Sequence, residues 1–137
     1  MCFGCNRNIL NNKNKKDEYE LLRFVNKLNY SIIGGASKLL KYFIKTNQPT
    51  KIISYADKRW SNGNLYEKLN FKLNKISPPS FFYINNKKRE TRFKYQKHKL
   101  DSLGLLNNKN ISAADNMLIN GYYRIYDCGT KKYELII

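Results

Sequence analysis

The spacing of hydrophobic residues within residues 19–71 changes from a strand pattern to a helix pattern and back, and this stretch predicts the central unit of the fold. Residues 19–27 and 51–57 read as strands, because the first is largely apolar on both faces and the second is a short apolar run. Between them, apolar residues recur at the spacing of a helix with one buried stripe, formed by Ala36, Leu39, Leu40, Phe43 and Ile44. We therefore expect a right-handed βαβ unit with two parallel strands.

Local signals give the limits of this unit. Gly34 and Gly35 permit a tight turn before the helix, and the free amides of the first helical turn could hold an anion. The helix is expected to end near Asn47, because Pro49 disfavours helical geometry in the residue before it. A second, short helix should follow residues 58–63 and carry on one side Leu65, Tyr66 and Leu69.

The flanking segments predict further strands. Residues 1–9 should pair antiparallel with residues 19–27, across a polar loop at 11–17. Residues 71–76 and 81–84 read as two strands, because the adjacent prolines between them cannot lie inside a central ladder.

Three signals organise the last third of the chain. Residues 91–96 alternate aromatic and basic side chains, which predicts a strand with one basic, solvated face. Ser112 and Asp115 have the spacing of a capping box that opens a helix. A terminal hairpin is expected to join residues 122–127 to residues 132–137.

These elements predict an α+β fold. A chain of 137 residues is long enough for one domain with a single core. We expect that domain to span residues 1–137, with its core in residues 19–84. Residues 85–137 would add the basic strand, a helix and the terminal hairpin.

The net charge of the chain indicates what kind of partner it binds. The chain has 26 lysines and arginines against 10 acidic residues, a formal net charge of +16. Such a charge predicts attraction to nucleic acid, to a nucleoprotein or to an acidic protein surface. The alternative is a solvated basic surface from a source rich in lysine and asparagine. No run of apolar residues approaches a membrane span or a signal peptide, so we expect no membrane partner and a cytoplasmic location.

Three cysteines, an odd number, suit a reducing compartment better than a disulfide framework. Cys2 and Cys5 form a CxxC motif that Cys128 and His98 could extend to a zinc set. Strand alternation would instead point Cys2 and Cys5 to opposite faces, so we expect small buried thiols and no metal site.

Two motifs in the central unit resemble the GNAT N-acetyltransferase superfamily. The sequence LYEKLNF at residues 65–71, with Asn62 upstream, is similar to the superfamily segment N…LYEKLGF. The sequence SIIGGA at residues 31–36 resembles the superfamily's pyrophosphate-binding loop. This resemblance implies a three-layer α/β/α fold whose mixed, mostly antiparallel sheet contains a parallel pair around the βαβ unit.

A closer resemblance covers nearly the whole chain. It is to a C-terminal domain of phage and mobile-element proteins, which follows a Vsr-like or other homing-endonuclease domain; we expect the present protein to lack that nuclease domain. The matching segments are LLRFVNKL, IIGGASKLLKYFI, IISYADKRWSNGNLYEKLNF, KYQKHKL and GYYRIYDCGTKKYEL. The resemblance implies an accessory DNA-binding or counter-defence protein in the host cytoplasm.

The superfamily resemblance also implies an acetyl-CoA site and acetyl transfer. Tyr66 would protonate the departing thiolate, and Glu20 or Asp57 would deprotonate the amine. The coenzyme would lie on Ile33, Gly34, Gly35, Ala36, Ser37, Lys38 and Asn62. The alternative is that these glycines and Tyr66 only pack the fold.

The competing hypothesis is a basic binding module that holds phosphates. Its candidate residues are Lys58, Arg59, Trp60, Lys87, Lys88, Arg89, Arg92, Lys94, Lys97 and Lys99. Phe93 and Tyr95 could stack on bases, although strand alternation favours a core position for both. His98 reads as an ordinary exposed histidine. The acidic residues form no paired-carboxylate or HNH arrangement, so we expect no nuclease activity.

Overall fold

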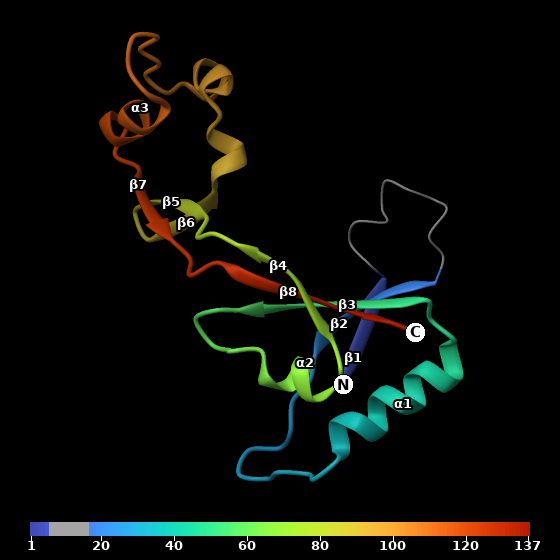
Figure 1. The fold of residues 1–137 in the computed structure, drawn as a ribbon. Helices are drawn as coiled ribbons and strands as arrows, with labels where there is room; N and C mark the ends of the chain where they lie inside the picture. The colour runs from blue at the N-terminus through green and yellow to red at the C-terminus, as the bar shows by residue number, and fades with distance from the viewer. Residues whose placement is uncertain (6–16) are drawn as a thin grey trace. The chain divides into compact units, whose positions relative to one another are not determined.

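A mixed five-stranded sheet in the order β1-β2-β3-β8-β4 lies at the centre of one part of the chain (Figure 1). The structure, a computed structural model, describes residues 1–5 and 17–137. Contacts divide them into a first unit, residues 1–78 with 129–137, and a second unit, residues 79–128. The strands of the first unit are β1 (Cys2–Cys5), β2 (Glu18–Arg23), β3 (Lys51–Asp57), β4 (Lys72–Ser77) and β8 (Thr130–Ile136).

The predicted βαβ unit is confirmed. Strands β2 and β3 pair in parallel, and α1 (Gly35–Asn47) connects them. The short helix α2 (Asn64–Lys68) follows β3, as expected. Strand β1 pairs antiparallel with β2, as expected, while the rest of the predicted strand 1–9 and nearly all of the loop 11–17 lie outside the described residues.

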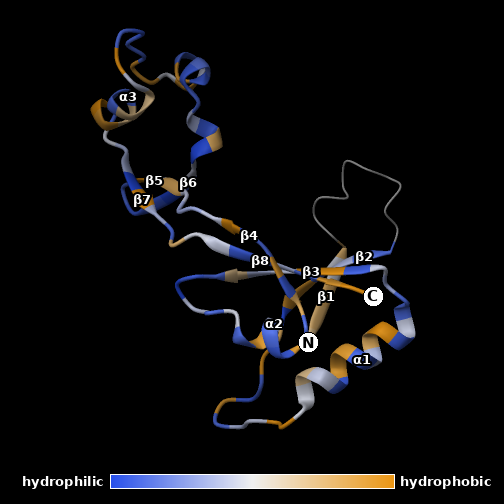
Figure 2. Cartoon of the chain, viewed as in Figure 1, coloured by the Kyte–Doolittle hydropathy of each residue, from blue (hydrophilic) through white to orange (hydrophobic). Residues whose placement is uncertain are grey.

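Helix α1 packs through the predicted stripe, with one correction. Leu40 is buried, and Ala36, Phe43 and Ile44 pack against the same core cluster. Leu39 keeps 44% of its surface exposed because it lies at the edge of the stripe, so its predicted burial is wrong. The ring of Phe43 stacks on that of Phe3, with 3.6 Å between centroids. Figure 2 shows the resulting alternation of hydrophobic and hydrophilic positions along the helix.

Both helices of the first unit lie on one face of its sheet (Figure 1). Residues of α1, α2 and four strands join a single core cluster. Among the described residues of the first unit, no helix covers the opposite face. The third layer of the expected α/β/α arrangement is therefore not seen there.

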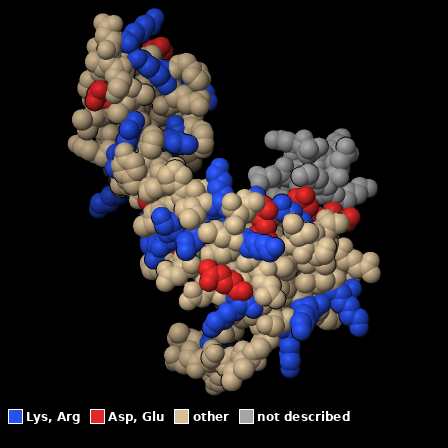
Figure 3. All heavy atoms as spheres, viewed as in Figure 1, with Lys and Arg blue, Asp and Glu red and all other residues tan. Residues whose placement is uncertain are grey.

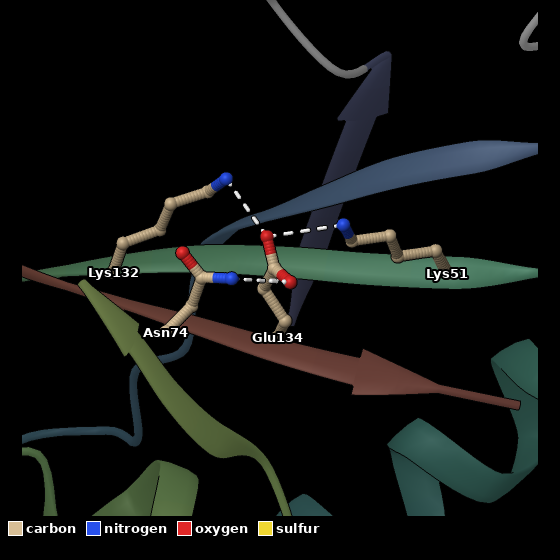
Figure 4. A network of polar contacts seen from close by, with 4 residues as sticks. All are labelled: Lys51, Asn74, Lys132 and Glu134. Carbon is tan, nitrogen blue, oxygen red and sulfur yellow. Dashed lines mark hydrogen bonds and ion pairs between the residues drawn. The ribbon is translucent and has the colours of Figure 1, made fainter.

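The opposite face carries an ion-pair network centred on Glu134 of β8 (Figure 4). Its carboxylate lies 3.0 Å from Lys51 Nζ and 2.8 Å from Lys132 Nζ, and it accepts a 2.8 Å hydrogen bond from Asn74. Burial raises the pKa of Glu134, but hydrogen bonds from the two lysines outweigh this and leave the pKa lowered. The carboxylate therefore stays ionised at neutral pH and neutralises positive charge across β3, β8 and β4.

Tyr133 of β8 fixes the turn before α2. Its fully buried ring stacks on Tyr66 at 4.9 Å, and its hydroxyl lies against Gly63. A Cβ at Gly63 would come within 1.9 Å of that hydroxyl oxygen, and the φ of Gly63 is +96°. Only glycine satisfies both constraints at this position.

The second unit contains a three-stranded antiparallel sheet in the order β6-β5-β7. Its elements are β5 (Phe81–Asn85), β6 (Lys88–Thr91), α3 (Ala113–Ile119) and β7 (Tyr123–Tyr126). Asn86 and Lys87 both have positive φ, as a tight hairpin turn requires. Ser112 is the N-cap of α3, as predicted: its hydroxyl accepts from the Asp115 amide and donates to the Asp115 carboxylate.

Two predictions for this region are wrong. Residues 91–96 form no basic strand; β6 ends at Thr91 and a 3-10 helix spans Arg92–Tyr95. This turn buries Tyr95, whose hydroxyl donates to Glu90 at 2.6 Å. The terminal hairpin does not form either, because β7 pairs with β5 whereas β8 pairs with β3 and β4.

The expected core segment 19–84 also differs from the structure. Strand β5 lies inside that segment, but it pairs with β6 and β7 in the second sheet. A separate cluster of Tyr83, Tyr95, Leu100 and Met117 forms the core there. Within the described ranges, no helix is both long and apolar enough to cross a membrane.

We expect Gly63→Ala to lower the free energy of unfolding by at least about 2 kcal/mol, since it combines steric overlap with backbone strain. Gly34→Ala is the matched control, because Gly34 has a φ of +72° but open space around its Cβ position. That control should cost about 1 kcal/mol. Urea denaturation followed by circular dichroism measures both, and equal losses would contradict the role given to Tyr133.

Candidate functional site

The first candidate site is the start of α1. Gly34 occupies the N-cap with a left-handed conformation, no side chain caps the helix, and its first turn holds no carboxylate. The Gly35 amide donates to the Ile32 carbonyl, and the Lys38 amide begins the helical ladder. Ile33 is almost fully exposed beside this turn. The predicted loop from Ile33 to Lys38 is thus an exposed, uncapped helix start that an anion could approach.

A groove lies between α1 and α2. It has a volume of about 230 Å³ and is lined mainly by apolar side chains. Ser37 and Lys41 line it from α1, and Lys68 lines it from α2. The two lysines add positive charge to this apolar lining, and the volume is below the range of about 300–1,000 Å³ that is usual for small-ligand pockets.

Strands β2 and β3 part after Glu20 and Ile53, although both strands continue. The Ser54 hydroxyl lies at this point, 2.7 Å from the Leu21 carbonyl oxygen and 2.9 Å from the Tyr66 hydroxyl. Ser54 has one proton, which it can donate either to the Leu21 carbonyl or to the Tyr66 hydroxyl, and the Tyr66 hydroxyl also lies 3.5 Å from the Tyr55 carbonyl, which can only accept. The predicted acid, Tyr66, is thus held at the parting of the strands.

The two predicted bases do not share this position. Strand alternation places Glu20 and Ser54 on opposite faces of the sheet, and Glu20 is buried. Asp57 lies at the end of β3, where its carboxylate accepts the Arg59 amide at 2.8 Å and its carbonyl accepts two further turn amides. The structure therefore places only Tyr66 where β2 and β3 part. Glu20 lies on the opposite face of the sheet, and Asp57 stabilises the turn after β3.

The turn after β3 carries the first predicted basic cluster. Lys58 and Arg59 are exposed, and Trp60 exposes 81% of its surface. Asn62 follows on the same turn, where its carbonyl accepts from Lys131 Nζ at 2.9 Å. The backbone of Asn62 thus helps to hold β8 against this turn. The contact of Asn62 with a coenzyme stays a prediction.

The second unit carries the other predicted basic residues, and they differ in availability. Lys87, Lys88 and Arg89 are exposed around the hairpin turn. Lys94 forms a 2.6 Å ion pair with Glu90, which lowers the pKa of that carboxyl together with the hydrogen bond from Tyr95. Lys97 is half-buried and donates to two backbone carbonyls, so it is a structural residue.

Exposed guanidinium groups contact aromatic rings in this unit. Arg89 lies 4.5 Å from the ring centroid of Phe82, on one face of the sheet. On the other face, Arg92 lies 5.4 Å from Phe81, and Arg124 lies 4.3 Å from the same ring. Such stacking orients an arginine while its N–H groups remain available to an anion.

Sequence reasoning missed Arg124 and Phe81. The signal was present in the segment YRIY at residues 123–126, which places an arginine between aromatic residues of a strand. A hydrogen bond to the Tyr83 hydroxyl raises the pKa of Arg124 further, so its charge is permanent. Phe93, expected in the core, instead exposes 63% of its surface.

The cysteines form no metal cluster in the described part of the chain. Cys2, Cys5 and Cys128 are free thiols, and all three are exposed, so their expected burial is wrong. Among residues 1–5 and 17–137, no three histidine, cysteine or acidic side chains come together to hold a metal.

Comparison with known proteins gives no family for this chain: no family model matches it, and no curated protein does.

We expect Lys97→Met to lower the free energy of unfolding by about 1–3 kcal/mol, because it leaves the carbonyls of Lys109 and Ile111 without their donor. Lys99→Met removes the same charge at an exposed position, where the ammonium makes one long hydrogen bond of 3.5 Å to the Phe93 carbonyl, and it should stay within about 0.5 kcal/mol of the parent chain. Chemical denaturation compares the two. A neutral Lys97→Met would return that lysine to the set that could bind phosphates.

Proposed function

We propose that the protein binds nucleic acid through the basic surface of its second unit. The observation that carries this proposal is the contact of Arg89, Arg92 and Arg124 with aromatic rings on an antiparallel sheet. Residues 79–128 contain nine lysines and arginines against four acidic residues. Figure 3 shows lysines and arginines (blue) spread over the visible surface of both units, with scattered acidic residues (red) between them.

The physical argument joins two terms. Lysines and arginines that neutralise phosphates release bound counterions, which gives affinity for any nucleic acid. Aromatic rings and guanidinium planes beside those charges add stacking with bases. A nucleoprotein or an acidic protein surface would bind through charge alone. An affinity that depends on the presence of bases therefore distinguishes free nucleic acid from these partners.

The resemblance to domains of phage and mobile-element proteins supports an accessory DNA-binding or counter-defence role, in the host cytoplasm. In that role the partner would be a nucleic acid or a nucleic-acid-guided complex. The low number of carboxylates favours binding over cleavage.

We expect the triple variant Lys87→Gln, Lys88→Gln and Arg89→Gln to weaken binding to labelled DNA and to make binding less salt-dependent. Each lost phosphate contact should reduce the slope of log affinity against log salt by about 0.7–0.9. Fluorescence anisotropy across a salt series measures both quantities.

The matched control removes the same charge from exposed lysines of the first unit: Lys45→Gln, Lys72→Gln and Lys75→Gln. Equal losses in the two variants would show a response to net charge alone and would contradict an interface on the second unit. Absence of any salt-dependent binding by the parent chain would refute the proposed function.

A second candidate is an acetyl-CoA-dependent N-acetyltransferase with a GNAT arrangement in the first unit. It is favoured by the uncapped start of α1, the groove between α1 and α2, and Tyr66 at the parting of two parallel strands. In that arrangement the pyrophosphate would lie on the first-turn amides, and Tyr66 would be the acid.

Calorimetric titration with acetyl-CoA tests this candidate. We expect saturable one-to-one binding that Ser37→Ala retains and Ser37→Asp abolishes, because a carboxylate in the first turn suits the helix but repels phosphate. No binding by the parent chain would contradict the coenzyme site and leave Tyr66 as a packing residue.

A further inference from the structure

A pocket of about 310 Å³ lies inside the second unit, bounded by the sheet, by the 3-10 helix Arg92–Tyr95 and by the first residue of α3. This volume is at the lower end of small-ligand pockets, about 300–1,000 Å³. The side chains that matter here are Phe81, Arg92, Phe93, Gln96 and Arg124.

The pocket is positively charged. Arg92 and Arg124 line it, and no carboxylate does. Among the described residues, neither arginine forms an ion pair. Glu90 is engaged by Lys94 and Tyr95 and lies outside the pocket lining. Both guanidinium groups contact the ring of Phe81, so the pocket gathers two positive charges that a bound anion would neutralise.

The pocket also offers a largely exposed aromatic ring, that of Phe93. Arg92 lies 5.2 Å from the Phe93 centroid, a longer separation than the 4.3 Å between Arg124 and Phe81. Phe93 remains 63% exposed, which leaves ring surface available to a planar ligand. Tyr95, two residues on, is buried against Tyr83 and Tyr122 and holds this turn in place.

From these features we propose that the pocket takes one unpaired nucleotide of a single strand. The base stacks on Phe93, the amide of Gln96 is within the same pocket for the base edge, and Arg92 and Arg124 hold the adjoining phosphate. Bases in a duplex are covered by their neighbours, so only an unpaired base can use this ring. The inference rests on the proposed function and narrows it to single strands.

The test is fluorescence anisotropy at fixed salt with two labelled strands of equal length. One is an oligothymidylate, and the other has abasic tetrahydrofuran residues in place of nucleosides. Both carry the same phosphates, so they separate stacking from charge. We expect Phe93→Ala to weaken oligothymidylate binding roughly 5- to 150-fold and to leave abasic binding unchanged.

Two further variants make the test specific. Tyr123→Ala removes a ring that is 61% exposed on β7 but does not line the pocket, and it should change neither affinity. Phe93→Trp keeps a stacking surface and should retain oligothymidylate binding. Because Phe93 is largely exposed, circular dichroism should show Phe93→Ala folded.

Each remaining outcome is decisive. If Phe93→Ala binds both strands as the parent does, or weakens both equally, the nucleotide pocket is refuted while nucleic-acid binding by charge stands. If the parent chain binds neither strand, both the pocket and the proposed function fail.

Discussion

The packing of Tyr133 against Gly63 constrains the whole first unit. Strand β8 lies between β3 and β4, and Tyr133 reaches from it to the turn that opens α2. The same ring stacks on Tyr66, and the neighbouring Glu134 forms ion pairs with Lys51 and Lys132 on the other face of the sheet. Since β8 follows the second unit in sequence, the five-stranded sheet is incomplete until residues 129–137 pair with β3 and β4. The second unit is therefore an insertion between two paired strands.

This arrangement explains why Tyr66 supports two interpretations. Its ring belongs to the packing around Tyr133, whereas its hydroxyl lies beside Ser54 where β2 and β3 part. A tyrosine held in this way is positioned rigidly enough to act as a general acid. The same packing is also what a purely structural core residue would show. In the second unit, by contrast, Arg92 and Arg124 are exposed and contact rings without a carboxylate partner among the described residues. The pocket of the second unit thus holds two positive charges that a bound anion would neutralise.

Local signals in the sequence predicted the local structure well. Periodicity placed α1, β3 and the parallel pair, and the spacing of Ser112 and Asp115 placed the start of α3. Errors came where distant contacts decide. Alternation in residues 91–96 predicts a strand, but Tyr95 packs against the rings of Tyr83 and Tyr122, and the chain forms a 3-10 helix there. The last two strands are near in sequence, yet each has better partners elsewhere, and no local pattern records those partners. Arg124 was overlooked because its ring partner lies 43 residues away in the sequence.

Hydrogen–deuterium exchange in the presence of an oligothymidylate tests the central claim most directly, because it reports the binding surface without any substitution. The account predicts slower exchange in peptides that cover residues 81–96 and 123–126, with no change at the start of α1. Protection confined to residues 33–38 or to the turn at residues 58–62, with residues 81–96 unaffected, would contradict it.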